Sequence, residues 1–304
     1  MSFTKEVKEE VIKHSIEEIA KISLFSAIVS TNQIEKDKIK ITTENASLAR
    51  YIFSTIKEIL QITPQVTVRN GYNYHKNYIY IIEIKKENSC LEKLGIKEDK
   101  LPSLFIYDDD ALKRNYIKGV FLTTGSINDP KTSRYHLEFM LSNETYAIFF
   151  SNLLNDFNLG SKYIKKDNKY MVYIKEAEKI GDFLRIIETV QALLYYEDIR
   201  IYRDHKNMTN RLNNCEQANV DKIIFAAANQ VEDIKIIDNI GGLTLLDDKV
   251  KGAATYRLKY PEASLIELSE IITEETGNTI TKSGLNHRFR KIKELANKIR
   301  NKQI

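Results

Sequence analysis

Apolar positions in this 304-residue chain repeat every second residue in some stretches and at helical spacing in others. Alternation of apolar with polar side chains predicts half-buried strands at 38–42 and 134–141. Helical spacing predicts helices at 45–60 and 143–157. The apolar positions of these helices are Ala49, Ile52, Phe53, Ile56 and Leu60 in the first and Ile148, Leu153 and Phe157 in the second. We predict Thr43 and Ser142 as the N-caps of the two helices.

Residues 116–130, which read YIKGVFLTTGSINDP, contain an apolar helical run that has Gly119 in its middle and closes on Gly125-Ser126. A mid-helix glycine costs roughly 0.5 to 1 kcal/mol relative to alanine, so it calls for a packing reason, usually the close approach of another backbone. Residues 24–34, LFSAIVSTNQI, supply a partner in which the small residue Ala27 stands where Gly119 does. We therefore expect a close helix–helix seam at Ala27 and Gly119.

The two helical runs begin an internal duplication. Ala27 and Gly119 are 92 residues apart, and each run is followed by a strand, a helix and a hairpin in the same order. The hairpins join 65–69 to 78–85 and 162–165 to 169–175. Asp167-Asn168 predicts a tight turn in the second hairpin, whereas Asn70-Gly71 opens a longer loop in the first. Each half is thus expected to form helix, strand, helix, strand, strand.

The chain changes character after about Arg203. Residues 211–237 contain no glycine or proline and have helical periodicity, which predicts one or two long helices that break at 239–242. Two helices follow at 246–259 and 265–275, the second with Ser264 as its N-cap. A break at 276–278 precedes a last helix that starts after Thr281. The C-terminal part is therefore expected to be all-α.

These patterns predict an α+β protein in which a pseudo-two-fold duplicated domain is followed by an all-α domain. We assign the duplicated domain to 1–205, with repeats at about 20–86 and 113–198. A helical linker is expected at 206–242 and a helix-turn-helix domain at 243–304. The length of the chain and its 42% hydrophobic content fit more than one folded domain.

The last predicted helix contains the strongest sequence signal for DNA binding. Leu285, Phe289, Ile292, Ala296 and Ile299 form one apolar stripe, and Glu294 is the only acid. Asn and Arg can each make two hydrogen bonds to a base in the major groove, whereas Lys suits phosphates. We therefore expect a helix-turn-helix that contacts DNA, although a solvated basic helix in a plain bundle is the alternative. The predicted DNA-binding residues are Lys282, Ser283, Asn286, His287, Arg288, Arg290, Lys291, Lys293 and Lys298, with Arg300 further along.

Charge and composition restrict the functional classes to which the chain can belong. The net charge of +4 and the isoelectric point of about 8.7 are too modest to indicate nucleic-acid binding by themselves. No apolar run reaches the roughly 18 residues of a membrane span, and the charged N-terminus does not resemble a signal peptide, so a cytoplasmic, nucleoid-associated protein is expected. Two isolated cysteines and five scattered histidines predict no disulfide, metal or cofactor; they are Cys90, Cys215, His14, His75, His136, His205 and His287.

The whole chain resembles the WhiA family, bacterial proteins that join a degenerate LAGLIDADG homing-endonuclease-like domain to a C-terminal helix-turn-helix. The segments that carry the resemblance are 119–130, 211–234, 261–272 and 280–292. The resemblance implies a regulator of sporulation, cell division and chromosome segregation in Gram-positive bacteria and their wall-less relatives. It also implies that the helical runs around Ala27 and Gly119 correspond to the two LAGLIDADG helices of a nuclease.

The acids of such a nuclease are missing here. LAGLIDADG nucleases place a carboxylate at the eighth motif position of each helix to hold divalent metal at the scissile phosphate, because a hard cation needs anionic oxygen ligands. Asn32 and Thr124 occupy these positions. We interpret the nearby Asp108, Asp109, Asp110 and Asp129 as turn and N-cap residues. The expectation is a protein without enzymatic activity.

Double-stranded DNA is the expected partner, and another transcription factor or RNA polymerase is a further expected partner. We expect neither binding to a membrane nor a small-molecule substrate. Two alternatives remain open: an active endonuclease whose acids come from elsewhere in the chain, and a protein-interaction scaffold. The surface of the duplicated domain fits DNA or protein. Its charged residues are Arg134, His136, Lys162, Lys165, Lys169, Glu83 and Glu138, and its clustered tyrosines, for which cross-strand packing is favoured over base stacking, are Tyr72, Tyr74, Tyr78 and Tyr80.

Overall fold

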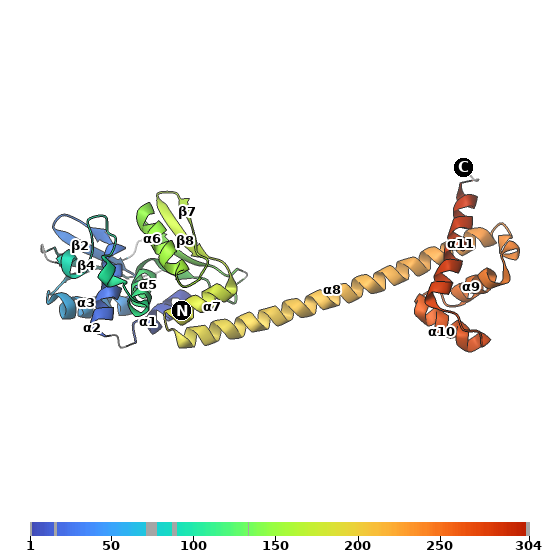
Figure 1. Ribbon diagram of the computed structural model, residues 1–304, viewed down its shortest axis with the longest axis horizontal. Coiled ribbons are helices and arrows are strands. Elements are labelled where there is room, and N and C mark those ends of the chain that lie inside the picture. Colours follow the sequence, from blue (N-terminus) through green and yellow to red (C-terminus); the bar gives the residue numbers. More distant parts are fainter. Residues whose placement is uncertain (1, 15–16, 71–77, 87–89, 133, 302–304) are drawn as a thin grey trace. The chain divides into compact units, whose positions relative to one another are not determined.

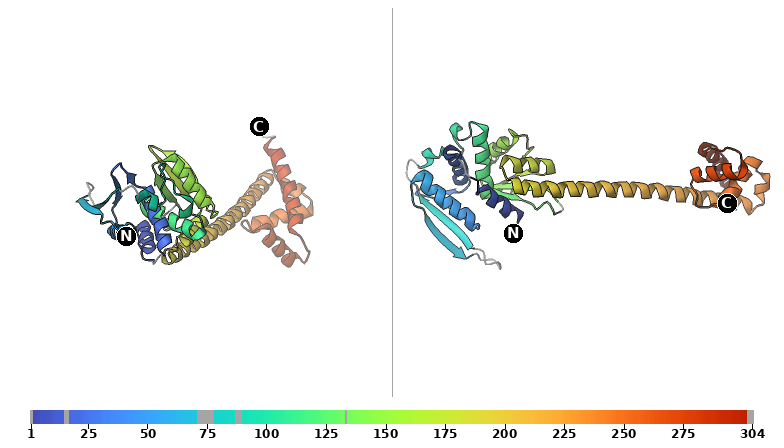
Figure 2. Two further views of the ribbon diagram at one scale, coloured as in Figure 1. Left: turned by 60° about the vertical axis from the view of Figure 1, so that its left-hand side comes forward. Right: turned by 90° about the horizontal axis from the view of Figure 1, so that it is seen from below.

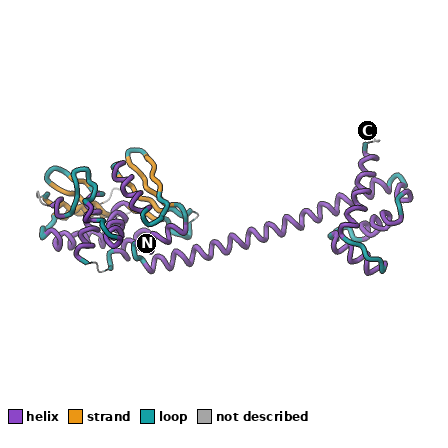
Figure 3. Tube along the Cα trace, in the orientation of Figure 1, coloured by secondary structure: helices purple, strands orange, loops and turns teal. Residues whose placement is uncertain are grey.

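The computed structural model describes residues 2–14, 17–70, 78–86, 90–132 and 134–301. The chain divides into two compact units, Met1–Asp204 and His205–Ile304. Strands are found in the described part of the first unit, while the described part of the second is helical (Figures 1 and 3). This is the α+β architecture that the strand and helix periodicities of the sequence predict.

Helices α2 (Glu18–Ser30) and α5 (Asp110–Thr124) pack against each other in the first unit, and each leads into its own antiparallel sheet. The strand orders, β1-β2-β4-β3 and β5-β6-β8-β7, repeat the same topology and confirm the duplication. The strands of the first sheet are β1 (Gln33–Ile34), β2 (Lys38–Thr43), β3 (Gln65–Asn70) and β4 (Tyr78–Lys85). Those of the second are β5 (Gly125–Ile127), β6 (Leu137–Leu141), β7 (Lys162–Lys166) and β8 (Lys169–Ile174).

One face of each sheet is covered by a helix. Helix α3 (Ala46–Leu60) lies along the first sheet, as the right-hand view of Figure 2 shows, and α6 (Glu144–Asn155) takes the same place on the second. The alternating residues Ile39 and Ile41 are fully buried opposite Ile84 and Ile82, so the period-two pattern marks the core-facing side. In the second sheet, Phe139 is fully buried in the same way opposite Val172.

Several local predictions were wrong. Thr43 and Ser142 are not the N-caps; Asn45 and Asn143 are, because their side chains accept hydrogen bonds from the first-turn backbone N–H groups. Thr43 is instead the last residue of β2. Ile148 is exposed, since α6 buries a neighbouring stripe that includes Ala147 and Phe150.

The strands also differ in detail from the prediction. Strand β6 begins at Leu137 rather than at residue 134, because its partner β5 ends at Ile127. The two short strands β1 and β5 were not predicted. Asp167-Asn168 forms the expected tight turn between β7 and β8, with a φ of +54° at Asp167. The loop that Asn70-Gly71 opens lies outside the described residues.

Further helices complete the first unit and lead into the second. Helix α1 (Phe3–Val11) packs on α5, β5 and α3. The connection to α5 contains α4 (Cys90–Lys93) and the 3-10 turn η1 (Leu104–Ile106), and α7 (Ala177–Ile186) follows β8. Helix α8 (Val190–Asp238) is one continuous helix of 49 residues, which begins well before the predicted residue 211.

The second unit contains η2 (Gly242–Leu245), α9 (Asp248–Lys259), α10 (Leu265–Thr276) and α11 (Lys282–Arg300). Its core is formed by the C-terminal part of α8 together with these helices. Helix α9 starts two residues after the predicted position, because the Asp247 carboxylate accepts a hydrogen bond from the Val250 N–H at 2.9 Å and caps the helix. The buried core residues are Ile234, Ile237, Val250, Ala253, Ala254, Leu268, Ile272, Leu285, Phe289, Ile292 and Ala296.

Candidate nucleic-acid interface

Two helices joined by a short turn form the centre of the second unit. Ser264 caps α10 in a reciprocal capping box with Glu267, and the pKa of the Glu267 carboxyl is lowered by its hydrogen bonds to Ser264. Gly277 ends α10 with a φ of +68°, a conformation that favours glycine. Thr281 then caps α11 by accepting a hydrogen bond from the Gly284 N–H at 3.1 Å. Both helix ends are thus fixed by local hydrogen bonds.

The apolar stripe of α11 packs inward, as predicted. Leu285, Phe289, Ile292 and Ala296 are buried, and Ile299 packs against the same core. This packing sets the rotation of α11 about its axis and leaves the opposite face in solvent. Six of the predicted DNA-binding residues have exposed side chains along the first three turns of the helix: Lys282, Ser283, Asn286, His287, Arg290 and Lys293. Lys298 is exposed further along the helix.

The remaining predicted contacts are tied to other helices. The Arg288 guanidinium donates to the Lys249 carbonyl at 3.2 Å, and the Lys291 ammonium lies 3.8 Å from the Asp247 carboxylate. Arg300 pairs with Asp233 at 2.8 Å and also with Glu232. Arg288 and Lys291 therefore point toward the start of α9, whereas Arg290 stays on the exposed face, 3.2 Å from the His287 imidazole.

Arg257 was not singled out from the sequence, although it joins several elements of this unit. Its guanidinium is buried, donates to Gln230 on α8 at 3.0 Å and to the carbonyls of Tyr260 and Ala263, and lies over the Phe289 ring. Burial lowers the pKa of Arg257 from its usual range. A lone arginine on a predicted helix gives no sequence signal for such a role, because its burial depends on residues far away in the chain.

The seam of the first unit has the close approach that its small residues predict. A methyl group at Gly119 would clash with the Leu24 carbonyl oxygen and would lie 2.7 Å from the Ala27 Cβ atom. The Thr31 and Thr123 hydroxyls meet across the seam at 2.8 Å and mark equivalent positions of the two halves. The side chains at the two predicted degenerate motif positions turn back onto their own helices: Asn32 donates to the Ile28 carbonyl and Thr124 to the Val120 carbonyl, both at 2.8 Å.

Carboxylates near the seam have structural roles. Asp109 caps α5 by accepting a hydrogen bond from the Leu112 N–H at 2.7 Å, and Asp129 accepts one from the Lys131 N–H in the following turn. Among the described residues, no three His, Cys, Asp or Glu side chains come together as metal ligands. Cys90 is buried and Cys215 is exposed.

The sheets of the first unit carry both basic and acidic side chains on their surface. Lys162, Lys165 and Lys169 are exposed on the β7–β8 hairpin, but two charged residues on the central strands are paired: Glu83 with Lys38 at 2.7 Å and Glu138 with His136 at 3.1 Å. Arg134 is exposed. Tyr80 packs on the core while Tyr78 is exposed. Tyr72, Tyr74 and His75 lie outside the described residues.

Comparison with known proteins decides the family. Three family models match the chain: the WhiA N-terminal LAGLIDADG-like domain at 14–97, the WhiA LAGLIDADG-like domain at 113–206 and the WhiA C-terminal HTH domain at 209–296. The "Probable cell division protein WhiA" of Staphylococcus aureus (strain USA300) is 41% identical over 99% of this chain and 98% of its own length. The chain belongs to the WhiA family.

Solved structures of the WhiA family share the fold. The full-length WhiA of Thermotoga maritima matches 98% of this chain and 99% of its own with a TM-score of 0.57 and 24% identity. A crystal structure of a WhiA N-terminal LAGLIDADG domain matches 62% of this chain and 90% of its own, with a TM-score of 0.52 and 24% identity. Within the part of the chain that the structure describes, no helix is both long and apolar enough to span a membrane.

Proposed function

We propose that this WhiA-family chain is a non-enzymatic DNA-binding protein that regulates transcription in cell division and chromosome segregation. The observation that carries the proposal is the exposed face of α11, where Asn286 and Arg290 stand free of the core on a helix whose rotation is fixed by Leu285 and Phe289. Their side chains suit base edges, and Lys282, Lys293 and Lys298 suit phosphates. In this proposal, residues 243–304 form the DNA-binding domain, 206–242 the linker and 1–205 the LAGLIDADG-like domain.

Contacts outside α11 divide the basic residues into two groups, since the ion pair of Arg290 with Glu294 at 3.9 Å lies within that helix. Arg288 ties α11 to the start of α9 through the Lys249 carbonyl, and the exposed Lys291 lies near Asp247 at the same place, so we assign both residues to orienting the helix. Arg290 and Lys298 are available to DNA, because neither contacts the core. This division refines the predicted set: substitutions at the first pair act mainly on the fold, and substitutions at the second pair act on binding.

Two other functions receive less support. A metal-dependent nuclease needs carboxylates at the seam, but Asn32 and Thr124 hydrogen-bond to their own helices there. A pure protein scaffold gives no reason for an exposed basic face on α11. We further propose that the protein acts at the nucleoid, and that another transcription factor or RNA polymerase is its protein partner.

The experiment is a DNA-binding assay on the full chain, in which bound sites are first selected from a random pool. Arg290→Ala is expected to weaken binding to the selected site about tenfold or more and to relax preference at one base position, because a bidentate contact discriminates by about 1–3 kcal/mol. Lys235→Ala, an exposed lysine on α8, removes the same charge and should leave the preference unchanged. Equal effects of the two variants would contradict base reading by α11. Magnesium-dependent cleavage of the selected site would support the nuclease instead.

A further inference from the structure

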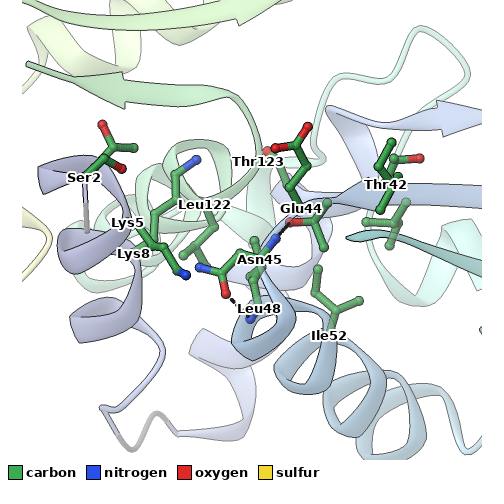
Figure 4. A pocket seen from close by; sticks show the side chains of 14 residues that line it. Ser2, Lys5, Lys8, Thr42, Glu44, Asn45, Leu48, Ile52, Leu122 and Thr123 are labelled. Carbon is green, nitrogen blue, oxygen red and sulfur yellow. Dashed lines mark hydrogen bonds between the residues drawn. The ribbon is translucent and has the colours of Figure 1, made fainter. Parts of the chain in front are cut away.

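A cavity of about 550 Å³ opens in the first unit between α1, β2, α3 and the end of α5 (Figure 4). One wall is apolar, formed by Ile41, Leu48, Ile52, Ile79 and Leu122. The charged residues that line it are Lys5, Lys8 and Glu44. The cavity belongs to the first unit, whereas the proposed DNA contact belongs to the second.

Asn45 presents an unsatisfied hydrogen-bond donor in this cavity. Its side-chain oxygen accepts hydrogen bonds from the N–H groups of Ser47 at 2.9 Å and Leu48 at 3.2 Å, as the N-cap of α3. This capping fixes which end of the amide faces the helix, so the amide nitrogen must point the other way. That Nδ2 atom is buried and donates no hydrogen bond to a described residue. A buried donor without an acceptor is destabilising by about 1–3 kcal/mol, which makes it a feature that needs an explanation.

Lys8 brings a second donor to the same place. Figure 4 shows the ends of the Lys8 and Asn45 side chains turned toward each other, while Lys5 and the Glu44 carboxylate point elsewhere. The Lys8 ammonium lies over the Phe121 ring at 5.5 Å and pairs with no carboxylate among the described residues. Two donors, one of them cationic, thus lie close together, and no described residue accepts a hydrogen bond from either, which is an arrangement that suits an anion.

The duplication provides an internal comparison. The equivalent place in the second half is lined by Thr31, Lys100, Asn143 and Tyr146, and only about 10 Å³ is open there. Leu48 and Tyr146 each follow the capping asparagine by three residues, but the larger Tyr146 fills the space and its hydroxyl meets that of Tyr116 at 2.7 Å. The shared fold therefore does not by itself require a cavity at this position.

We propose that the cavity between α1 and α3 binds a small organic anion. Its carboxylate or phosphate oxygens pair with Lys8 Nζ and accept a hydrogen bond from Asn45 Nδ2 once the side chains that cover this atom shift, and its carbon skeleton packs on Ile41, Leu48 and Ile52. Such a ligand satisfies the buried amide and neutralises the ammonium at once. The ligand is bound without undergoing a reaction, so the site is neither a metal site nor a substrate site.

The test measures binding of sodium phosphate and of sodium hexanoate to the full chain by calorimetry, with sodium chloride at equal ionic strength as the reference. Saturable binding of at least one anion at pH 7 is expected, at least tenfold weaker at pH 9.5, where Lys8 is neutral. Binding of phosphate alone identifies a phosphorylated ligand, and binding of hexanoate alone identifies a carboxylate. If neither anion binds, the proposal is overturned.

Three variants locate the binding. Asn45→Asp retains an oxygen that caps α3 but replaces the donor by a negative charge, and Leu48→Tyr fills the cavity as Tyr146 does in the second half. Each should weaken anion binding at least tenfold, while circular dichroism shows a folded chain. Lys36→Met removes an exposed lysine outside the cavity and should bind as the parent does. Undiminished binding in both cavity variants would overturn the proposal, because the anion would then sit elsewhere.

Discussion

At the scale of single residues, the seam of the first unit depends on a missing side chain. Gly119 lets the α5 backbone approach the Leu24 carbonyl and the Ala27 methyl group, and this approach holds the two halves together. The sequence predicted this contact, because glycine in an apolar helix has a known cost and needs a compensating reason.

Gly119→Ala should therefore lower the free energy of unfolding by about 1–3 kcal/mol, since the added methyl group forces two backbones apart. Gly252 in α9 is the matched control, because a methyl group there meets no atom within 4 Å. Gly252→Ala should raise the free energy of unfolding by about 0.5–1 kcal/mol through helix propensity. Chemical denaturation of both variants measures the contrast, and a stability gain at residue 119 would contradict the seam.

Lys8 makes a second prediction at this scale. Burial lowers the pKa of its ammonium from 10.5 to about 8, so the folded state gives up a proton more readily than the unfolded state does. Below pH 8 the buried charge costs a constant amount, and that cost disappears as the pH rises from 8 to 10.5. Lys8→Met should thus be more stable than the parent at pH 7, by on the order of 1–3 kcal/mol, with the difference shrinking up to pH 10.5. Urea unfolding across this range measures it, and a constant difference would contradict the burial of the charge.

At the scale of elements, periodicity predicted the helices and the long strands, whereas helix ends depended on local contacts. Thr43 and Ser142 were good N-cap residues by type, but Asn45 and Asn143 make the capping hydrogen bonds. Strands β1 and β5, with two and three residues, are too short to show a period. The apolar stripe of α11 was predictable from spacing alone. The attachment of Arg288 to Lys249, and the burial of Lys8 and Arg257, depend on distant elements and could not be predicted.

Arg257→Ala tests how the helices of the second unit are joined. The substitution leaves the Tyr260 and Ala263 carbonyls and the Gln230 amide without their donor and opens a cavity beside Phe289. We expect a loss of about 2 kcal/mol or more from the free energy of unfolding of this unit. Lys251→Ala, an exposed neighbour on α9, should cost less than about 0.5 kcal/mol. Hydrogen exchange of α11 amides measures the effect, and equal protection in both variants would contradict the role of Arg257.

At the scale of the whole molecule, the two units have separate cores, and the proposed DNA contact belongs to the second. Removal of residues 243–304 should therefore abolish sequence-specific DNA binding while leaving the first unit folded. In the full chain, Lys298→Ala should weaken binding to all sequences alike and reduce the slope of log K against log salt by about 1. Filter binding at several salt concentrations measures both effects. Retention of full affinity by the truncated chain would place the DNA contact in the first unit.

The close packing of Gly119 on Ala27 separates the ability to fold from the ability to cleave. These two residues hold the helices together, whereas Asn32 and Thr124 at the helix ends satisfy their own hydrogen bonds without charge. A nuclease on the same framework would need two carboxylates side by side, and their repulsion would act against folding until a metal neutralised it. Under the proposed non-enzymatic function, a gain of carboxylates at these two positions would therefore first pass through less stable sequences.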